Sequence, residues 1–256
     1  MFGKKTVPEN AKEAEAIRKN KVSDSIFLFI AVFMTLISAF TYVMVGVGLI
    51  TTIMIVIWAL ALLQCVIKGR KRFFELMILF SIAVTIILFF LLTAAKGFRS
   101  TTSWKYNAQR KYVDLIHNGH SDCFPDKLPD DISDYSIEYL PSFLQGTGHF
   151  RVHFKTSAEQ IARYENEYSA QAIYTIPLSD FNDSRRVQVK EISPKASATY
   201  EGDSTLDVSY DNKFWEGHEN NSTVYFISAV HNWNHPHSGA VIINKTEKMV
   251  EFTHLG

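Results

Sequence analysis

Apolar residues are concentrated in the first 95 positions of the chain, and apolar and polar residues alternate over shorter intervals after that point. Residues 25–67 contain no charged residue, and residues 73–95 contain only one, Glu75. A membrane-spanning helix needs about 20 consecutive apolar residues. The pattern therefore predicts three transmembrane helices, at about 25–44, 47–67 and 73–95, with a turn near 42–48 between the first two.

Two amphipathic helices are predicted in the rest of the chain. The first lies around 104–117, where three- and four-residue spacing places on one face Trp104, Ala108, Tyr112, Leu115 and Ile116. The second lies around 157–168, where Ser157 and Gln160 form a capping-box pattern. Its apolar stripe consists of Ala158, Ile161, Tyr164 and Tyr168.

Alternating segments predict strands at 135–140, 148–154, 186–192, 223–231, 239–244 and 249–254. The first two are expected to pair as a hairpin with a longish loop, and the last two as a hairpin around Lys245-Thr246-Glu247. Residues 194–221 are predicted to consist mainly of loops. Strands with segregated helices indicate an α+β domain with a mainly antiparallel sheet.

The predicted organisation has three parts. Residues 1–24 form a polar cytoplasmic segment, helical or disordered; residues 25–95 form the three-helix transmembrane region; residues 96–256 form an extracytoplasmic α+β domain. Residues 1–95 carry ten Lys and Arg against five Asp and Glu, which gives +5, and residues 96–256 carry sixteen against twenty-one, which gives −5. The basic residues lie before the first span and at 68–72. The positive-inside rule therefore predicts a multi-pass protein of the cell membrane with a cytoplasmic N-terminus and an outer C-terminal domain.

The apolar segments indicate an anchor rather than a transporter, because no charged residue lies near the middle of a predicted span. Hydroxyl side chains there are expected to bond to their own helix or to a neighbouring one: Thr35, Ser38, Thr51, Ser81 and Thr85.

Several function classes are disfavoured. A mildly acidic domain without a basic stripe is a poor partner for nucleic acid. The chain has no phosphate-binding G-x-x-x-x-G-K-[ST] motif, no H-E-x-x-H, no G-x-S-x-G and no C-x-x-C. Cys65 and Cys123 are placed on opposite sides of the membrane, so no disulfide is expected, and Cys123 is predicted to be a small buried residue.

Histidine is the most unusual feature of the composition, since all nine lie after residue 96. The densest group contains His231, His235 and His237. Three histidines can hold a zinc ion, but Asn, Trp and Pro between them favour a loop. We therefore predict no cofactor and keep zinc as an alternative. His149 and His153 share a strand face with Arg151 and are expected to be solvated. A calcium site is disfavoured, because its five candidate ligands lack regular spacing: Asp122, Asp126, Asp130, Asp131 and Asp134.

Aromatic residues in predicted loops are candidates for ligand binding, because exposed aromatic side chains mark binding surfaces. The candidates are Phe143, Trp215 and Trp233, and Phe214 is a neighbour of the same kind. The alternative is that they cap the core or rest against lipid headgroups. No catalytic residue is predicted.

Short motifs in residues 123–255 resemble uncharacterised extracytoplasmic domains of Gram-positive bacterial membrane proteins and lipoproteins. The residues that carry the resemblance are Phe124-Pro125-Asp126, Leu128-Pro129-Asp130, Phe143 to Gly146, Trp233-Asn234-His235 and Gly239 to Glu251. The resemblance implies a location outside the cell membrane and no particular activity. It does not include the apolar segments.

These observations favour a membrane-anchored, non-enzymatic module whose partners are the lipid bilayer and a protein, cell-envelope component or small ligand. One alternative is an extracytoplasmic hydrolase that uses His231, His235 or His237 with a metal or as a general base. Another is an accessory subunit of a membrane complex. The pattern leaves the oligomeric state open.

Overall fold

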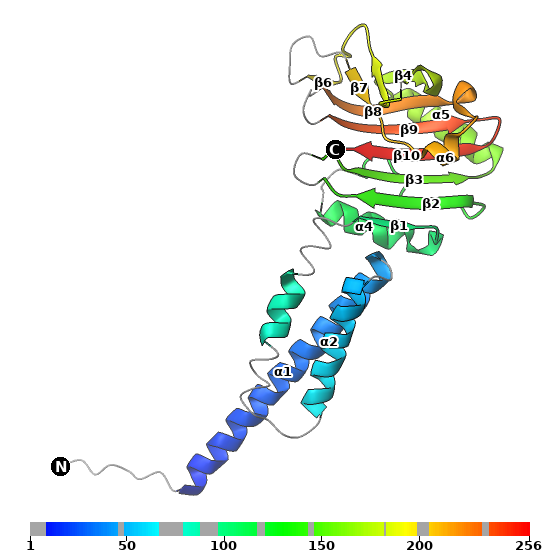
Figure 1. Ribbon diagram of the computed structural model, residues 1–256. Helices are drawn as coiled ribbons and strands as arrows, with labels where there is room; N and C mark the ends of the chain where they lie inside the picture. Colours follow the sequence, from blue (N-terminus) through cyan, green and yellow to red (C-terminus); the bar gives the residue numbers. More distant parts are fainter. Residues whose placement is uncertain are drawn as a thin grey trace. The chain divides into compact units, whose positions relative to one another are not determined.

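The computed structural model describes residues 9–45, 49–66, 79–87, 97–116, 121–142, 146–181, 183–198, 205–231 and 236–256. The chain divides into two compact units, residues 1–90 and 91–256. The first is helical, and the second is an α+β domain with a large sheet (Figure 1). Each is described by itself below.

The helical unit contains α1 (Glu9–Val45), α2 (Leu49–Val66) and a further helix at 79–87. Helix α1 runs without a break from the polar N-terminal segment into the apolar run. A small buried cluster joins α1 and α2 through Ala31, Trp58 and Ala61. Part of the predicted turn, residues 46–48, lies outside the described residues.

The prediction of three transmembrane helices is wrong for this structure. Among the described residues, one helical segment is long and apolar enough to cross a membrane, Ser25–Val43, and the apolar helix Thr51–Leu63 is shorter. Of the predicted span at 73–95, only 79–87 is described, so the remainder of that prediction and Glu75 lie outside the described residues. The absence of charge determines the polarity of a segment but not the length of the helix that it forms.

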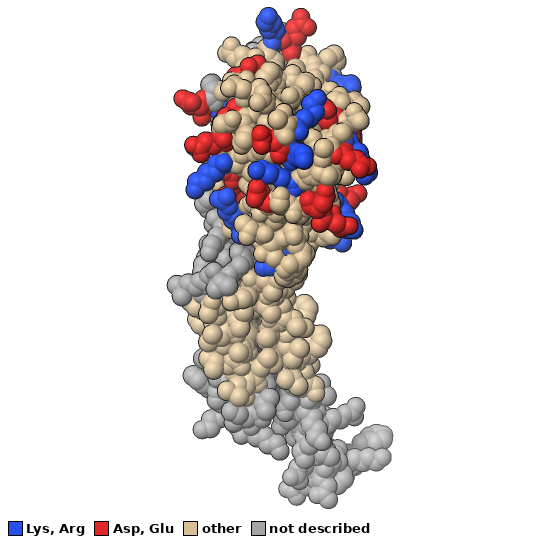
Figure 2. All heavy atoms as spheres, turned by 90° about the vertical axis from the view of Figure 1, so that its right-hand side faces the viewer, with Lys and Arg blue, Asp and Glu red and all other residues tan. Residues whose placement is uncertain are grey.

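The surface and interior of the helical unit differ from those of a water-soluble bundle. Large apolar side chains are exposed on the described parts of all three helices, among them Phe29, Leu36, Leu60 and Phe80. Several polar side chains are buried: Ser38, Thr41, Thr51 and Thr85. Figure 2 shows the described part of this unit without a Lys, Arg, Asp or Glu on the face in view.

Two of the five predicted hydroxyl groups, those of Thr35 and Thr85, bond as the sequence predicts, whereas the buried Ser38 Oγ has no hydrogen-bond partner among the described residues. Thr35 Oγ1 donates to the carbonyl oxygen of Ala31 at 2.7 Å, and Thr85 Oγ1 accepts a 2.7 Å hydrogen bond from the indole Nε1 of Trp58 on α2. The first contact satisfies the hydroxyl within its own helix. The second links two helices.

The sheet of the α+β domain has the strand order β1-β2-β3-β10-β9-β8-β4. Neighbours along this order are antiparallel, and β6 adds a short parallel pairing to β8. The strands are β1 (Phe98–Ser100), β2 (Ser133–Leu140), β3 (His149–Lys155), β4 (Tyr174–Pro177), β6 (Ser197–Ala198), β8 (Thr223–His231), β9 (His237–Asn244) and β10 (Met249–Leu255). A second, two-stranded sheet consists of β5 (Arg186–Gln188) and β7 (Thr205–Asp207).

One face of the large sheet packs against the two longer helices, α4 (Tyr106–Ile116) and α5 (Ala158–Gln171). Its core combines side chains from both helices with those of the central strands, including Tyr106, Ile161, Phe150, Val152 and Phe252. Burial of this apolar surface supplies the main driving force for folding.

The other face of the sheet is apolar only in part. Its apolar half lies over β8 and β9, where Phe226 and Ile242 pack with Leu206 of β7 and Trp215 of α6 (Asn212–Trp215). Short 3-10 helices complete the domain at Ser103–Lys105, Leu178–Asp180 and Glu219–Asn221. The half of this face over β1, β2, β3 and β10 is polar and contains the candidate site.

Both predicted hairpins are confirmed, because β2 pairs with β3 and β9 pairs with β10 in antiparallel register. A Cβ added to Gly148 would lie 2.4 Å from the carbonyl oxygen of Leu140, so the close approach of β2 and β3 needs a glycine there. The strand predicted at 186–192 is shorter, and the expectation of loops over 194–221 missed β6, β7 and α6.

The helix predicted around 157–168 is confirmed as α5, with Ile161, Tyr164 and Tyr168 buried. The helix predicted around 104–117 exists as α4, but the predicted buried face is wrong. Trp104 and Leu115 are 73% and 85% exposed, and the buried residues are Tyr106, Gln109 and Val113. The hydroxyl of Tyr106 fixes this rotation by donating to the carbonyl oxygen of Pro125 at 2.5 Å.

Candidate functional site

The polar half of the sheet face results from strand alternation on β3. Its even-numbered side chains, Phe150, Val152 and Phe154, enter the helix-covered core, so His149, Arg151 and His153 share the opposite face. In the register of the sheet, Arg151 is the partner of Glu138 on β2 and of Thr253 on β10. The neighbouring position on β10, opposite His153, is Glu251.

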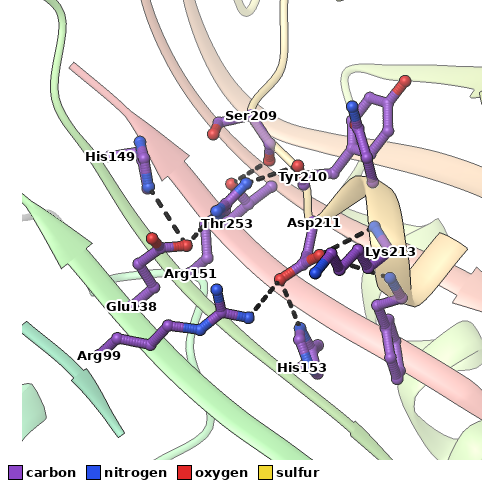
Figure 3. A network of polar contacts seen from close by, with 12 residues as sticks. Arg99, Glu138, His149, Arg151, His153, Ser209, Tyr210, Asp211, Lys213 and Thr253 are labelled. Atoms are coloured by element: carbon purple, nitrogen blue, oxygen red, sulfur yellow. Dashed lines mark hydrogen bonds and ion pairs between the residues drawn. The ribbon is translucent and has the colours of Figure 1, made fainter.

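Residues 208–215, here called the covering segment, lie over these polar side chains and connect β7 to the end of α6 (Figure 3). The sheet binds its backbone at three successive residues. Thr253 Oγ1 donates to the carbonyl oxygen of Ser209 at 2.5 Å, and Arg151 Nη1 donates to that of Tyr210 at 2.5 Å. The backbone N–H of Asp211 donates to Glu251 Oε1 at 3.0 Å.

Arg151 also forms an ion pair with Glu138, so its buried charge is compensated within the sheet. Burial alone would raise the pKa of Glu138. The hydrogen bond and charge of Arg151 outweigh burial, so the pKa of Glu138 lies below its ordinary value. His149 Nε2 lies 3.7 Å from Glu138 Oε2. Burial, reinforced by the charge of Arg151, lowers the pKa of His149 to about 4, so this imidazole is neutral at pH 7.

His153 is held between an aromatic ring and a carboxylate. Its ring stacks on that of Phe214 with centroids 4.0 Å apart, and its Nδ1 lies 4.0 Å from Asp211 Oδ2. Burial lowers the pKa of His153 to about 4 although Asp211 acts in the opposite direction. The expectation that His149 and His153 are solvated is therefore wrong: the covering segment shields the face that they share.

Asp211 is the N-cap of α6 and links this helix to the edge of the sheet. Its Oδ1 accepts hydrogen bonds from the backbone N–H groups of Lys213 and Phe214 at 3.0 and 3.4 Å, as an N-cap does. Its Oδ2 pairs with Arg99 Nη2 of β1 at 3.1 Å. The covering segment is thereby tied to the edge strand as well as to the centre of the sheet.

Glu251 is completely buried and has two partners, the backbone N–H of Asp211 and the indole Nε1 of Trp215, which donates at 2.5 Å. Burial raises the pKa of Glu251 to about 7. Of the two readings of Trp215, the exposed loop aromatic is wrong and the alternative, that it caps the core, is confirmed: it is 0% exposed at the end of α6 and packs in the apolar cluster over β8 and β9.

The charged groups beneath the covering segment are therefore engaged in holding that segment in place. The backbone of the segment is hydrogen-bonded by Arg151 and by Glu251, and Asp211 is itself part of the segment. This arrangement positions the covering segment, and a cavity lies at the end where His149 is found.

That cavity has a volume of about 280 Å³. It is lined by Thr147, His149, Ser184, Arg185, Arg186, Asp207, Val208, Ser209, Pro236 and Leu255. It will be called the His149 pocket. Its lining contains one partly buried imidazole and two arginines, and Arg186 Nε pairs with Asp207 Oδ1 at 2.5 Å.

Arg185 adopts a backbone conformation that is uncommon for a residue with a side chain, with φ of 60°. Its carbonyl oxygen accepts a 3.1 Å hydrogen bond from Val208 N. Its guanidinium donates to Asn212 Oδ1 at 3.0 Å and lies 5.0 Å from the ring centroid of Tyr210. Such a conformation costs on the order of 1–2 kcal/mol, and these contacts with Val208, Tyr210 and Asn212 of the covering segment maintain it.

A second cavity, of about 690 Å³, shares Arg185 with the His149 pocket. Its other charged lining residues are Lys213 and the acidic Asp183, Glu216 and Glu219. Its lining does not include His149, and its charge balance is acidic.

The structure does not bring the predicted histidines together. His231 is buried, 1% exposed, beside the ring of Tyr174, whereas His237 is exposed at the start of β9, and His235 lies outside the described residues. Within the described ranges, no three His, Cys, Asp or Glu side chains are grouped to hold a metal ion. Phe143 and Trp233 also lie outside them.

The remaining predicted candidates have separate structural partners. Asp126 pairs with Arg110, Asp130 with Lys127 and Asp134 with Lys155. Asp131 accepts hydrogen bonds from Thr156 and Ser157 at the start of α5. Cys123 is buried, as predicted, and burial raises the pKa of its thiol to about 12.

No family model, curated protein or solved structure matches the chain. The resemblance to extracytoplasmic domains of Gram-positive bacteria therefore stays a prediction.

Proposed function

We propose that the C-terminal domain is a non-enzymatic binding module of a membrane-attached protein, and that the His149 pocket is its ligand site. The observation that carries this proposal is the pocket itself, where a partly buried neutral imidazole, two arginines and three hydroxyl-bearing residues surround about 280 Å³. Small-molecule sites are concave and contain a few polar groups that fix the ligand's orientation. The hydrogen bonds of the covering segment support binding by keeping one wall of the pocket in place.

Binding is favoured over hydrolysis by the partners of the polar groups. The carboxylate nearest to His149 is Glu138, whose ion pair with Arg151 lowers its pKa. The carboxylate nearest to His153 caps α6. A general base needs to be within reach of a substrate proton, and these groups instead hold the walls of the pocket.

The ligand site can be tested with the full-length protein in mild detergent. We expect at least one compound from a panel of sugars, amino acids, carboxylates and phosphates to raise the Tm of the wild type. Arg185→Ala is expected to abolish that increase, whereas Arg163→Ala, an exposed arginine of α5, is expected to retain it. An equal increase in both variants, or no increase with any compound, contradicts the proposal.

Membrane attachment is supported by the apolar exterior of the described part of the helical unit and by the polar side chains buried within it. Contiguous apolar surface on a water-exposed protein marks a membrane or protein interface, and Ser25–Val43 has the length and composition to cross a bilayer. The Lys and Arg bias before residue 25 supports a cytoplasmic N-terminus and an extracytoplasmic C-terminal domain. A partner subunit bound to the same apolar surface is the alternative.

Cysteine labelling distinguishes these possibilities. In intact cells we expect a membrane-impermeant maleimide to label Ser169→Cys on the exposed face of α5, and to label Lys12→Cys only after permeabilisation. Protection of residue 169 in intact cells contradicts the proposed orientation. A second protein that co-purifies in stoichiometric amount in mild detergent supports the accessory-subunit alternative.

A further inference from the structure

The chemistry of the His149 pocket also indicates a class of ligand, an inference that rests on the proposed binding function. We infer that the His149 pocket binds a small molecule through an oxyanion, either a carboxylate or a phosphate. The lining residues contain two arginines and one carboxylate, that of Asp207. Because Asp207 pairs with Arg186, the charge of Arg185 is in excess among the lining residues of this pocket. Arg185 stands between this pocket and the second cavity, which Asn212 and Tyr210 also line.

Arg185 is oriented by groups that do not neutralise it. Among the described residues its guanidinium contacts the amide oxygen of Asn212 and the ring of Tyr210, and neither group carries a formal charge. A guanidinium presents a planar fork of donors that matches carboxylate and phosphate oxygens. Fixing its direction before a ligand arrives reduces the entropy lost on binding.

The other polar groups of the pocket complement this charge. Thr147, Ser184 and Ser209 bring hydroxyl groups to the lining, and a hydroxyl can donate to an anion. His149 is neutral at pH 7 and retains one ring N–H that can do the same. The larger neighbouring cavity shares Arg185 but has three acidic lining residues against two basic ones, so a small anion is expected to prefer the His149 pocket.

The test is isothermal titration calorimetry of the full-length protein in neutral-lipid nanodiscs, with inorganic phosphate, succinate and glucose as probes. We expect phosphate or succinate to bind, and glucose not to bind. Arg185→Ala should weaken binding by about tenfold to a hundredfold, since a hydrogen bond to a charged group has this effect on an equilibrium constant. Arg185→Lys should retain part of the affinity, and Arg163→Ala all of it. Raising the salt concentration from about 0.05 to 0.5 M should weaken binding further.

The possible outcomes separate the inference from the proposed function. If a neutral compound binds in a manner that needs Arg185 and neither anion does, the binding function stands and the anionic ligand is overturned. If no probe or panel compound binds, both are overturned. Nanodiscs of anionic lipid identify the source of the anion: loss of phosphate binding there indicates a lipid headgroup, and unchanged binding indicates a soluble anion.

Discussion

The indole Nε1 of Trp215 donates a 2.5 Å hydrogen bond to the carboxyl group of Glu251, and both side chains are completely buried. Trp215 ends α6, and Glu251 lies in the middle of β10. This contact therefore fastens the end of the covering segment to the centre of the sheet. It also connects the apolar and polar halves of one sheet face, since Trp215 belongs to the apolar cluster over β8 and β9.

Replacing Trp215 by Phe should destabilise the domain by about 2–4 kcal/mol, because the change removes a buried hydrogen bond, leaves the Glu251 carboxyl with one partner fewer and opens a small cavity. Chemical denaturation of the full-length protein, followed by circular dichroism, measures the effect. Trp104→Phe is the matched control, because Trp104 is 73% exposed, and it should change stability by less than about 0.5 kcal/mol. Equal effects of the two changes would contradict the assigned role of Trp215.

Glu251 should make the domain less stable as the pH rises. Burial raises its pKa from 4.5 to about 7, so the folded domain holds a proton that the unfolded chain releases. The resulting stabilisation is fully present below pH 4.5 and is lost as the pH rises through 7, with a total effect of about 3 kcal/mol. In Glu251→Gln this part of the pH dependence should disappear. The exposed Glu216→Gln serves as a control and should keep the wild-type pH profile; an unchanged profile in Glu251→Gln would contradict the assignment.

His149 and His153 should act in the opposite direction at acidic pH. The pKa of each is lowered from 6.5 to about 4, mainly by burial. Their contribution to stability is present above pH 6.5 and is lost as the pH falls through 4, because the unfolded chain takes up protons that the folded domain excludes. His153→Gln should reduce the loss between these pH values by about 2–3 kcal/mol. His218→Gln, which changes a partly exposed histidine, is the control. If the two variants lose the same amount of stability between these pH values, His153 is not the group responsible.

Ser157→Ala should cost about 1 kcal/mol, because Ser157 is the N-cap of α5 and its hydroxyl accepts from Gln160 N. Ser169→Ala, on the exposed surface of the same helix, should cost less than half of that. The Tm values of the two variants provide the comparison. A similar Tm for both would indicate that the cap contributes little to α5.

Local sequence patterns predicted the elements whose neighbours are close in the chain. Helix α5 has its cap and its apolar stripe within 14 residues, and the β9–β10 hairpin is closed by a short turn in which Asn244 Oδ1 accepts from Glu247 N at 2.9 Å. In both elements, the residues that determine the structure lie close to one another in the sequence. The apolar stripe of α4 was assigned to the wrong face because its orientation depends on Pro125, which lies beyond the helix.

The candidate site was not predicted, because its two sides come from distant parts of the chain. Alternation showed that His149, Arg151 and His153 share a face, but nothing in β3 indicates that residues 208–215 cover it. One signal was available: Glu251 interrupts the apolar strand at 249–254, and a carboxylate in a buried strand needs a partner. Its partner, Trp215, was instead assigned to an exposed loop. Arg185 carried no signal, since its position depends on Val208 and Asn212.

The position of β10 has a consequence for how the domain is made. In the sheet, β10 lies between β3 and β9, although it is the last of these strands in the chain. During synthesis, β1, β2 and β3 therefore leave the ribosome about 100 residues before β10 can pair with β3, and at 5–20 residues per second they wait for roughly 5–20 s. Until then β3 is an open edge with the apolar Phe150, Val152 and Phe154 on one side. The nascent chain is expected to depend on chaperones during this interval, and release of a chain that ends before Met249 would leave two separate half-sheets.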